Sequence, residues 1–141
     1  MKIKYTSSLE GLTADMFDGG FWVGWSNPPA PDMHLHMLEN AYAFWLAIDE
    51  DAGKVVGFIN AVSDGVMAAY IPLLEVLTEY QGHNIGREIT QRLLDDLKHL
   101  YMVDICHDDD VTAFYAQFKP HQGLSSCFRN YEAQSGRRRN E

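Results

Sequence analysis

The sequence of 141 residues contains little cysteine and far fewer basic than acidic residues. Cys106 and Cys127 are too few for a disulfide scaffold, and we expect both to be reduced structural thiols. With 11 Lys and Arg against 20 Asp and Glu, the net charge is −9. Broad binding to nucleic acid depends on clustered positive charge. We therefore expect no nucleic-acid partner, whereas a small cationic partner is electrostatically favoured.

The chain also has no apolar run long enough for a membrane helix or a signal peptide. Its most apolar run, residues 66–74, is far shorter than the roughly 18 residues that suggest a membrane helix, and it contains Pro72. We therefore expect a cytoplasmic protein without a membrane partner. The length suits one domain with one core. That domain is predicted over residues 1–133, followed by a flexible polar tail over residues 134–141.

Runs of aromatic and β-branched residues predict a series of strands. These strands cover residues 3–5, 41–49, 54–63, 66–77 and 101–106, and residues 124–131 are expected to close the sheet. The dipeptide Asp64-Gly65 favours a type I′ turn between two antiparallel strands. Pro72 cannot donate a hydrogen bond to a neighbouring strand, so we expect the strands to separate there and leave a gap that can admit a ligand.

Amphipathic periodicity is clearest over residues 85–100, which are predicted to form a helix. Further helices are predicted over residues 12–17, over residues 31–40, and from Asp109 or Asp110 to Phe118. Residues 21–31, FWVGWSNPPAP, contain three prolines and should form an irregular but packed aromatic loop. The order of elements predicts an α+β fold with a mixed, mostly antiparallel sheet flanked by helices.

Residues 73–90, LLEVLTEYQGHNIGREIT, join a predicted strand to the amphipathic helix through a glycine-containing turn. The unpaired N–H groups and the dipole at a helix N-terminus attract phosphate, and Gly82 and Gly86 remove side chains that would block its approach. Arg87 is unfavourable beside the positive helix end unless an anion lies between them. The alternative is simple tight packing of a strand against a helix. The turn matches neither the P-loop nor the Rossmann pattern.

This segment resembles the acetyl-CoA motif of the GNAT acetyltransferase family, L-x-V-x-P-E-Y-[RQ]-G-x-G-[IV]-G. The matching residues here are Leu74, Val76, Glu79, Tyr80, Gln81, Gly82, Ile85 and Gly86. The strand order also matches, so the resemblance covers about residues 1–131 and implies a GNAT-like acyl-CoA N-acyltransferase fold. Thr78 replaces the usual proline and Asn84 the central glycine. Asparagine tolerates positive φ better than other non-glycine residues, so we expect the turn to survive.

The resemblance implies that acetyl-CoA binds as a co-substrate, and we expect no metal. The backbone of residues 76–78 would pair with the pantetheine arm, and the amides of residues 81–87 would hold the pyrophosphate. Asp108 takes the position of a family asparagine, and Lys119-Pro120 replaces the family's Gly-Phe. The residues expected to contact acetyl-CoA are Val76, Leu77, Thr78, Gln81, Gly82, His83, Asn84, Ile85, Gly86, Arg87 and Asp108.

Acetyl transfer from a thioester to an amine needs a neutral amine, a donor for the developing oxyanion and an acid for the leaving thiolate. By the resemblance, Tyr115 is the acid and the Val76 amide is the oxyanion donor. A core tyrosine is the alternative role for Tyr115. Glu75, which precedes this amide, is our candidate for the base that accepts the proton of the amine. The alternative for Glu75 is a solvated strand carboxylate.

Phe21, Trp22 and Trp25 lie where the GNAT family places the wall of the acceptor site, which would suit an amine with an apolar body. A packed mini-core or a subunit contact in a homodimer are the alternatives. His34 and His36 have no cysteine or carboxylate at matching spacing, so we interpret them as core or surface residues rather than metal ligands.

These inferences favour an N-acetyltransferase that transfers the acetyl group of acetyl-CoA directly to a small primary amine. The departures at Asn84, Asp108 and Lys119-Pro120 leave a second interpretation open, a catalytically weak acyl-CoA-binding sensor or scaffold module. A third is a structural α+β domain that dimerises through its aromatic loop.

Overall fold

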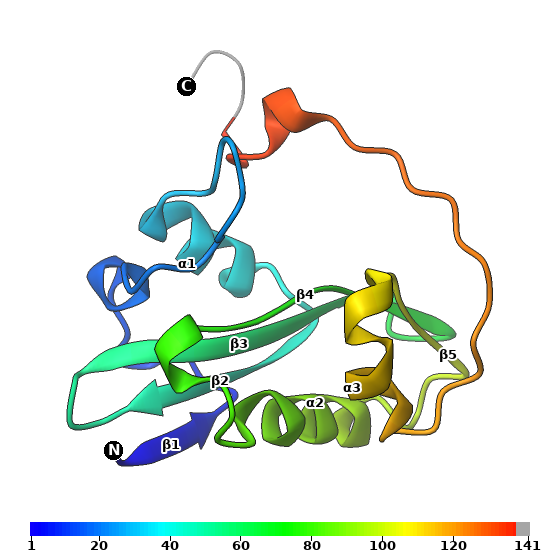
Figure 1. Cartoon of the computed structure of the whole chain (residues 1–141), viewed down its shortest axis with the longest axis horizontal. Coiled ribbons are helices and arrows are strands. Elements are labelled where there is room, and N and C mark those ends of the chain that lie inside the picture. The colour runs from blue at the N-terminus through cyan, green and yellow to red at the C-terminus, as the bar shows by residue number, and fades with distance from the viewer. Residues whose placement is uncertain (138–141) are drawn as a thin grey trace.

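The computed structural model describes residues 1–137, and a five-stranded sheet lies at its centre (Figure 1). The strands, in their order across the sheet, are β1 (Ile3–Thr6), β2 (Ala43–Asp49), β3 (Lys54–Ser63), β4 (Ala68–Val76) and β5 (Met102–Ile105). Neighbouring strands are antiparallel except β4 and β5, which are parallel. The prediction of an α+β fold with a mixed, mostly antiparallel sheet is therefore confirmed.

Helical elements cover both faces of the sheet (Figure 1). The amphipathic helix α2 (Ile85–Asp96) packs on one face, where its core residues include Ile85, Ile89 and Leu93. Helix α1 (Pro31–Glu39) and the 3₁₀ turn η1 (Ala14–Phe17) pack on the other face. Successive residues of a strand point to opposite faces. Ala47 of β2 therefore belongs to the core on the α2 face, while Leu46 and Ile48 belong to the core on the α1 face.

Strand β4 has two neighbours over only part of its length. It pairs with β5 from Ala68 to Ile71, and the next residue, Pro72, has no N–H to donate. Beyond Pro72, β4 pairs only with β3, as far as Val76. The predicted separation of the strands at Pro72 is confirmed, and it leaves one edge of β4 open.

The connection between β3 and β4 differs from the predicted type I′ turn. That turn needs positive φ at both central residues, but only Gly65 has it (φ 77°) and Asp64 does not. Instead, Asp64 Oδ1 accepts hydrogen bonds from the N–H groups of Val66 (2.9 Å) and Met67 (3.0 Å), which lengthens the connection to four residues. The Asp64 carboxylate thus takes the place of the backbone carbonyl that would accept the hydrogen bond in a two-residue turn.

Two predicted helices end earlier than expected. Helix α2 stops at Asp96 rather than Leu100, because the Leu97 N–H is shared between the carbonyls of Leu93 and Leu94, which tightens the last turn. Helix α3 (Thr112–Ala116) is shorter than predicted and follows a 3₁₀ turn, η3 (Asp109–Val111), that has no side-chain cap.

The prediction of a closing strand over residues 124–131 is wrong. Residues 119–130, which we call the arm, have no helix or strand, and every one of them is exposed. The arm runs in a wide arc from α3 back towards α1, as the orange trace in Figure 1 shows, and ends in the turn η4 (Tyr131–Ala133). Part of the predicted polar tail, residues 138–141, lies outside the described residues. In the described part of the chain, no helix has the length and apolar character needed to cross a membrane.

Candidate functional site

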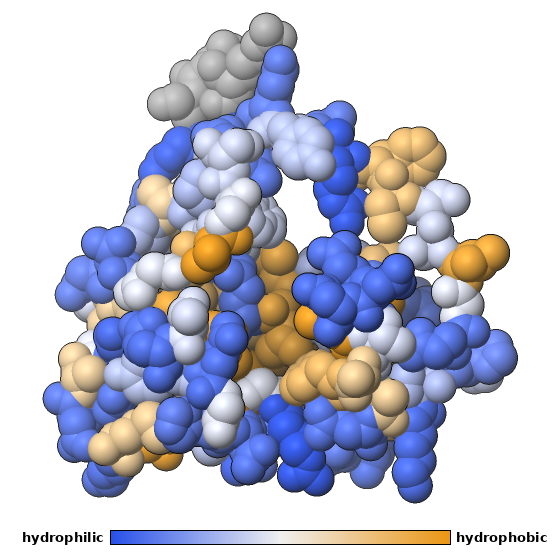
Figure 2. All heavy atoms as spheres, in the orientation of Figure 1, coloured by the Kyte–Doolittle hydropathy of each residue, from blue (hydrophilic) through white to orange (hydrophobic). Residues whose placement is uncertain are grey.

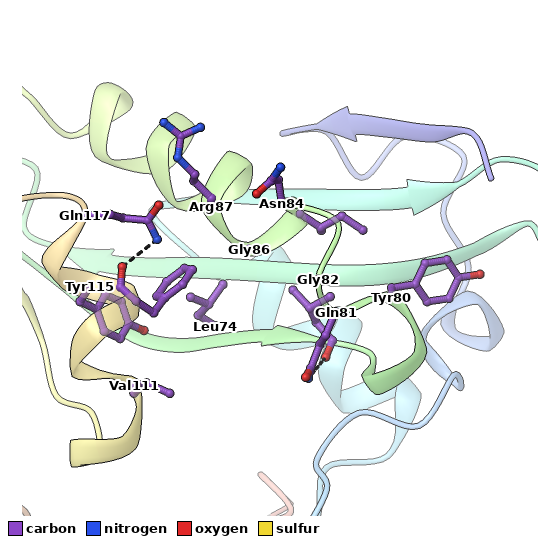
Figure 3. A pocket seen from close by; sticks show the side chains of 13 residues that line it. Leu74, Tyr80, Gln81, Gly82, Asn84, Gly86, Arg87, Val111, Tyr115 and Gln117 are labelled. Atoms are coloured by element: carbon purple, nitrogen blue, oxygen red, sulfur yellow. Dashed lines mark hydrogen bonds between the residues drawn. The ribbon is translucent and has the colours of Figure 1, made fainter.

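A cavity of about 520 Å³ lies where β4, α2 and α3 meet. Figure 3 shows the start of α2, with Asn84 and Arg87, and helix α3, with Tyr115, on either side of Leu74. Leu74 and Val76 come from the part of β4 that β5 no longer covers. The separation of the strands at Pro72 therefore opens directly into this cavity.

The turn before α2 has the conformation that a phosphate site needs. Asn84 occupies the N-cap of α2 in the left-handed conformation (φ 63°), so the prediction that asparagine replaces glycine without losing the turn is confirmed. Gly82 has φ 81°, and a Cβ at this position would meet no other atom within 4 Å. The approach to the helix N-terminus is therefore open at Gly82. At Gly86, a Cβ would lie 3.6 Å from the Phe114 ring, an ordinary van der Waals distance, so α2 lies close to α3 at this residue.

A buried hydrogen bond fixes this turn to the sheet. The Tyr80 hydroxyl donates to Asp49 Oδ2 at 2.7 Å, and Figure 3 shows the Tyr80 ring pointing away from the neighbouring Gln81. The bond to the Asp49 carboxylate raises the pKa of Tyr80 to about 12, and the same bond lowers the pKa of Asp49. Tyr80 therefore stays protonated and anchors the turn that presents Gln81 and Gly82.

The backbone of Val76 faces the open edge of β4. The N–H of Leu77 donates to Val56 of β3 (2.8 Å), and alternate residues of a strand point their backbone groups to the same side. Glu75 and Leu77 therefore face β3, while Leu74 and Val76 face away from it. The side-chain amide of Gln81 donates to the Val76 carbonyl at 3.1 Å. This leaves the Val76 N–H directed towards the open edge.

A second cavity, of about 260 Å³, meets the first at this edge, because Leu74, Val76 and Gln81 line both. The second cavity is also lined by Phe21 and Glu75. Glu75 is not the solvated carboxylate that one interpretation expected. Its Oε1 accepts a hydrogen bond from the Trp22 N–H at 2.9 Å, and its buried Oε2 has no partner among the described residues.

Burial in turn raises the pKa of Glu75, and the hydrogen bond from Trp22 opposes this change only in part. A carboxylate with a raised pKa beside a cavity can accept a proton more readily than an ordinary surface carboxylate. On the other side of the open edge, burial also raises the pKa of Tyr115. The Tyr115 ring stacks on His107 with centroids 4.6 Å apart. Glu75 on β4 and Tyr115 on α3 therefore line different cavities, and Val76 lines both.

Comparison with known proteins adds an independent observation. Residues 9–119 match the sequence profile of the acetyltransferase (GNAT) family. The chain belongs to the GNAT family. A crystal structure from Deinococcus radiodurans R1, assigned as an acetyltransferase, is 41% identical, with a TM-score of 0.89 over 94% of this chain and 92% of that one.

Two further relatives of this GNAT chain are more distant. A GNAT family acetyltransferase from Streptococcus pneumoniae TIGR4 is 27% identical and has a TM-score of 0.65, over 92% of this chain and 98% of that one. A curated relative, an N-acetyltransferase of Pyropia yezoensis named as uncharacterized, is 25% identical over 75% of this chain. The chain covers 64% of the length of that relative.

In this GNAT chain, the residues of the aromatic loop do not form a single wall. Phe21 lines the second cavity, but Trp22 is only 7% exposed and belongs to the core cluster under α1. Its ring packs against Trp25 (centroids 4.8 Å apart) and His34 (4.9 Å). Trp22 therefore belongs to a packed mini-core, which was the alternative to a wall of the acceptor site.

Most of the residues predicted to contact acetyl-CoA lie around the two cavities. Those that line at least one of them are Val76, Leu77, Thr78, Gln81, Gly82, Asn84, Ile85, Gly86 and Arg87. His83 and Asp108 line neither. His83 is exposed, and its Nδ1 lies 3.1 Å from the carbonyl oxygens of Tyr80 and Gln81, while Asp108 is exposed at the start of η3. The roles of these two residues stay predictions without support from their positions.

Five residues that line the larger cavity were missed as site residues: Leu74, Tyr80, Val111, Phe114 and Gln117. Val111, Phe114 and Gln117 recur every three residues on one side of η3 and α3. Because residues three apart lie on the same side of a helix, this spacing could have indicated that all three residues face the cavity. The histidine pair gives no metal site: His34 is buried and His36 is exposed. Within residues 1–137, no group of three or more His, Cys, Asp or Glu side chains could hold a metal ion.

Proposed function

We propose that this GNAT chain transfers the acetyl group of acetyl-CoA directly to a small primary amine, without a covalent enzyme intermediate. The observation that carries the proposal is the meeting of two cavities at the open edge of β4. One cavity has the N-terminus of α2 at its mouth, and the other has a buried carboxylate, Glu75. A two-substrate transfer needs such an arrangement, with each substrate entering from its own side.

The larger cavity is the proposed site of acetyl-CoA. The backbone amides from Gln81 to Arg87 would hold the pyrophosphate, because the turn is open at Gly82 and the N-terminus of α2 carries partial positive charge. The Val76 backbone would pair with the pantetheine arm once the side chain of Gln81 leaves the Val76 carbonyl. Bound acetyl-CoA supplies a thioester whose carbonyl carbon accepts the amine nitrogen.

The residues around the edge complete the reaction. Glu75, directly or through a water molecule, accepts a proton from the ammonium group of the acceptor. The neutral nitrogen then attacks the carbonyl carbon, and the Val76 N–H donates to the oxygen that becomes negative. As the carbon–sulfur bond breaks, the Tyr115 hydroxyl gives its proton to the sulfur. The nitrogen loses its second proton to solvent as the neutral amide forms. Solvent restores the proton of Tyr115, and the proton on Glu75 returns to solvent.

The smaller cavity limits the acceptor. Its volume of about 260 Å³ lies below the typical range for drug-sized ligands, which begins at about 300 Å³. It is lined by Phe21, Val23 and Leu77 among others, and Glu75 is its charged residue. These features favour a small amine with an apolar body and a single positive charge near the thioester.

Acetyl-CoA is expected to raise the melting temperature. At about 100 times the dissociation constant, the gain is about 2.7 kcal/mol, or roughly 8 °C for a domain of this size. Arg87→Ala should weaken binding about tenfold and remove about half of this gain, because Arg87 lines the cavity beside the phosphate site. Arg92→Ala is the matched control, since Arg92 pairs with Glu88 on the same helix and does not line the cavity. No shift in the wild type would contradict the proposed cofactor.

Thiol release from acetyl-CoA, measured with a panel of primary amines, separates an enzyme from a binding module. We expect release with at least one small, apolar amine. Asn84, whose side chain lines the cavity in place of a glycine, is the feature that favours the module. A thermal shift without thiol release on any amine would favour that second function.

Glu75→Gln is expected to lower kcat/KM by about tenfold, less than the roughly 100-fold typical of a lost general base, because water can also accept the proton. Glutamine keeps an oxygen that can accept the Trp22 N–H, so the loop stays anchored. The base must be ionised, and burial raises its pKa. The wild-type rate should therefore fall as the pH drops towards a value above the usual pKa of glutamate, and the variant should lack this decline.

Glu79→Gln is the control for this pH profile. Glu79 is exposed and lies 3.5 Å from the Lys54 ammonium, outside both cavities. Its replacement should leave the profile unchanged. If Glu75→Gln retains the wild-type rate and the wild-type profile, Glu75 serves only to anchor the aromatic loop.

A further inference from the structure

The two cysteines of the sequence lie together in the fold. Cys106 directly follows β5, and Cys127 lies in the arm. Figure 2 shows an opening between the arm and the rest of the molecule, but the arm passes beside the end of β5 (Figure 1). There the Cys127 thiol is a hydrogen-bonding neighbour of the Cys106 thiol. Both thiols are free, so the fold brings together two reduced sulfur atoms from distant parts of the sequence.

Polar groups from the sheet and from the arm surround the Cys106 thiol. Hydrogen bonding from the hydroxyls of Ser125 and then Tyr70 lowers the pKa of Cys106. The Cys127 thiol and the positive charge of Arg129 act on this pKa in the same direction. The Ser125 Oγ also lies 4.0 Å from the Cys127 Sγ, so one hydroxyl is close to both sulfur atoms. Cys106 therefore has more of the reactive thiolate form at neutral pH than an ordinary cysteine.

Both cysteines also meet the requirements of access and mobility. Cys127 is exposed and Cys106 is half-buried. Within residues 1–137, no backbone hydrogen bond joins the arm to the sheet, so the arm can adjust its path while the two sulfur atoms approach each other. A solvent-accessible thiolate beside a second cysteine is typical of thiols that respond to oxidation, whereas buried structural thiols are inert.

We propose that Cys106 and Cys127 form a reversible oxidation site, in which a disulfide between them fastens the arm to the end of β5. The oxidant is a small disulfide, of the class of glutathione disulfide. The Cys106 thiolate attacks one sulfur of this molecule, forms a mixed disulfide and releases one thiolate. Cys127 then loses its proton and attacks the Cys106 sulfur, which releases the second thiolate. The chain gives up two protons and two electrons, and the small disulfide takes up both to become two thiols.

The disulfide would also bear on the candidate site, although the proposal does not depend on acetyl transfer. The residue after Cys106 is His107, whose ring stacks on Tyr115 with centroids 4.6 Å apart. Helix α3 lies between the two cysteines in the sequence, and it is therefore part of the loop that the new bond would close. Oxidation would limit the movement of α3 relative to β5.

The first test follows both thiols of the full wild-type chain in mixtures of oxidised and reduced glutathione. Alkylation and mass spectrometry count the free thiols. We expect both thiols to disappear together, and the intact chain to lose the mass of two hydrogen atoms without forming a covalent dimer. Two glutathione adducts on each chain, a covalent dimer, or two thiols that stay free in excess oxidised glutathione would each overturn the proposal.

The same equilibrium in urea is the control for the contribution of the fold. It gives the effective concentration of one thiol with respect to the other. This value should be at least about tenfold higher in the folded chain than in the unfolded chain, because the fold holds the two thiols together. Equal values in the two states would mean that the fold does not favour the disulfide, and would overturn the proposal.

Cys127→Ser separates the two chemical steps. The variant keeps the attacking thiol but lacks the second one, so the mixed disulfide of Cys106 with glutathione should accumulate. A variant that forms no such adduct would overturn the proposal. In this background, the pH dependence of the reaction with a small aromatic disulfide measures the pKa of Cys106, which should rise when Ser125→Ala is added. Ser8→Ala is the matched control and should leave this pKa unchanged, since the Ser8 hydroxyl accepts only from the nearby Glu10 N–H.

Discussion

Replacing Tyr115 with phenylalanine is expected to lower the turnover of acetyl transfer by about 100-fold, the lower range for the loss of a general acid. The thiolate that leaves has a pKa of about 8.5, so a proton donor stabilises it as the carbon–sulfur bond breaks. Burial raises the pKa of Tyr115, and the hydroxyl therefore remains a donor throughout the neutral and mildly alkaline range. Phenylalanine keeps the ring that stacks on His107 but removes the proton.

The measurement is steady-state kinetics with the best amine from the panel, together with the dissociation constant of acetyl-CoA. A lost acid lowers kcat and leaves that dissociation constant within about twofold, because the interaction forms only in the transition state. Tyr101→Phe is the matched control, since Tyr101 is 84% exposed at the start of β5. An unchanged kcat in Tyr115→Phe would mean that Tyr115 is a packing residue of α3.

The part of the site that depends on local chemistry could be predicted from the sequence. Pro72 lacks a backbone donor wherever it lies, so a break in the pairing of β4 and β5 follows from the residue type alone. The left-handed conformation of Asn84 follows in the same way, because the motif requires positive φ and asparagine tolerates it. The periodicity of α2 predicted which residues face the core.

The part that depends on distant contacts could not be predicted. The Glu75 carboxylate is partly buried against a segment 53 residues earlier in the chain, where the Trp22 N–H donates to its Oε1. No pattern around Glu75 signals this partner, so the sequence alone favours a solvated strand carboxylate. Trp22 itself has φ 70°, which is rare for a bulky residue, and the turn that it forms buries its ring rather than presenting it to an acceptor.

The arm shows a different limit of sequence reasoning. Residues 124–131 have the composition of a strand, yet a strand needs a neighbour to pair with, and within residues 1–137 no backbone hydrogen bond joins this segment to the sheet. The composition of the segment favours a strand, but it does not identify the strand that would pair with it.

Histidine 34 should make the fold sensitive to acid. Its side chain is completely buried, and neither ring nitrogen has a hydrogen-bond partner among the described residues. The rings of Phe17, Trp22 and Phe58 surround it at centroid distances of 4.8, 4.9 and 4.2 Å. Burial among these rings lowers the pKa of His34 to about 3, because the charged form loses its hydration without gaining a partner.

The sign of the effect follows from proton binding. Below about pH 6.5 the unfolded chain takes up a proton at this histidine, whereas the folded chain does so only near pH 3, so acid favours unfolding throughout this window. The free energy of unfolding should fall by on the order of 4–5 kcal/mol across it, a large share of the roughly 5–15 kcal/mol of a typical domain. Urea unfolding at pH 7.0 and pH 4.5 should show a loss of about 2.7 kcal/mol, the part of the total that falls between pH 6.5 and pH 4.5. His34→Leu should retain more of its stability at pH 4.5 than the wild type, because leucine takes up no proton.

His36→Leu, an exposed position on the same helix, should behave like the wild type. Equal acid losses in the wild type and in His34→Leu would mean that a protonated His34 finds a partner in the fold.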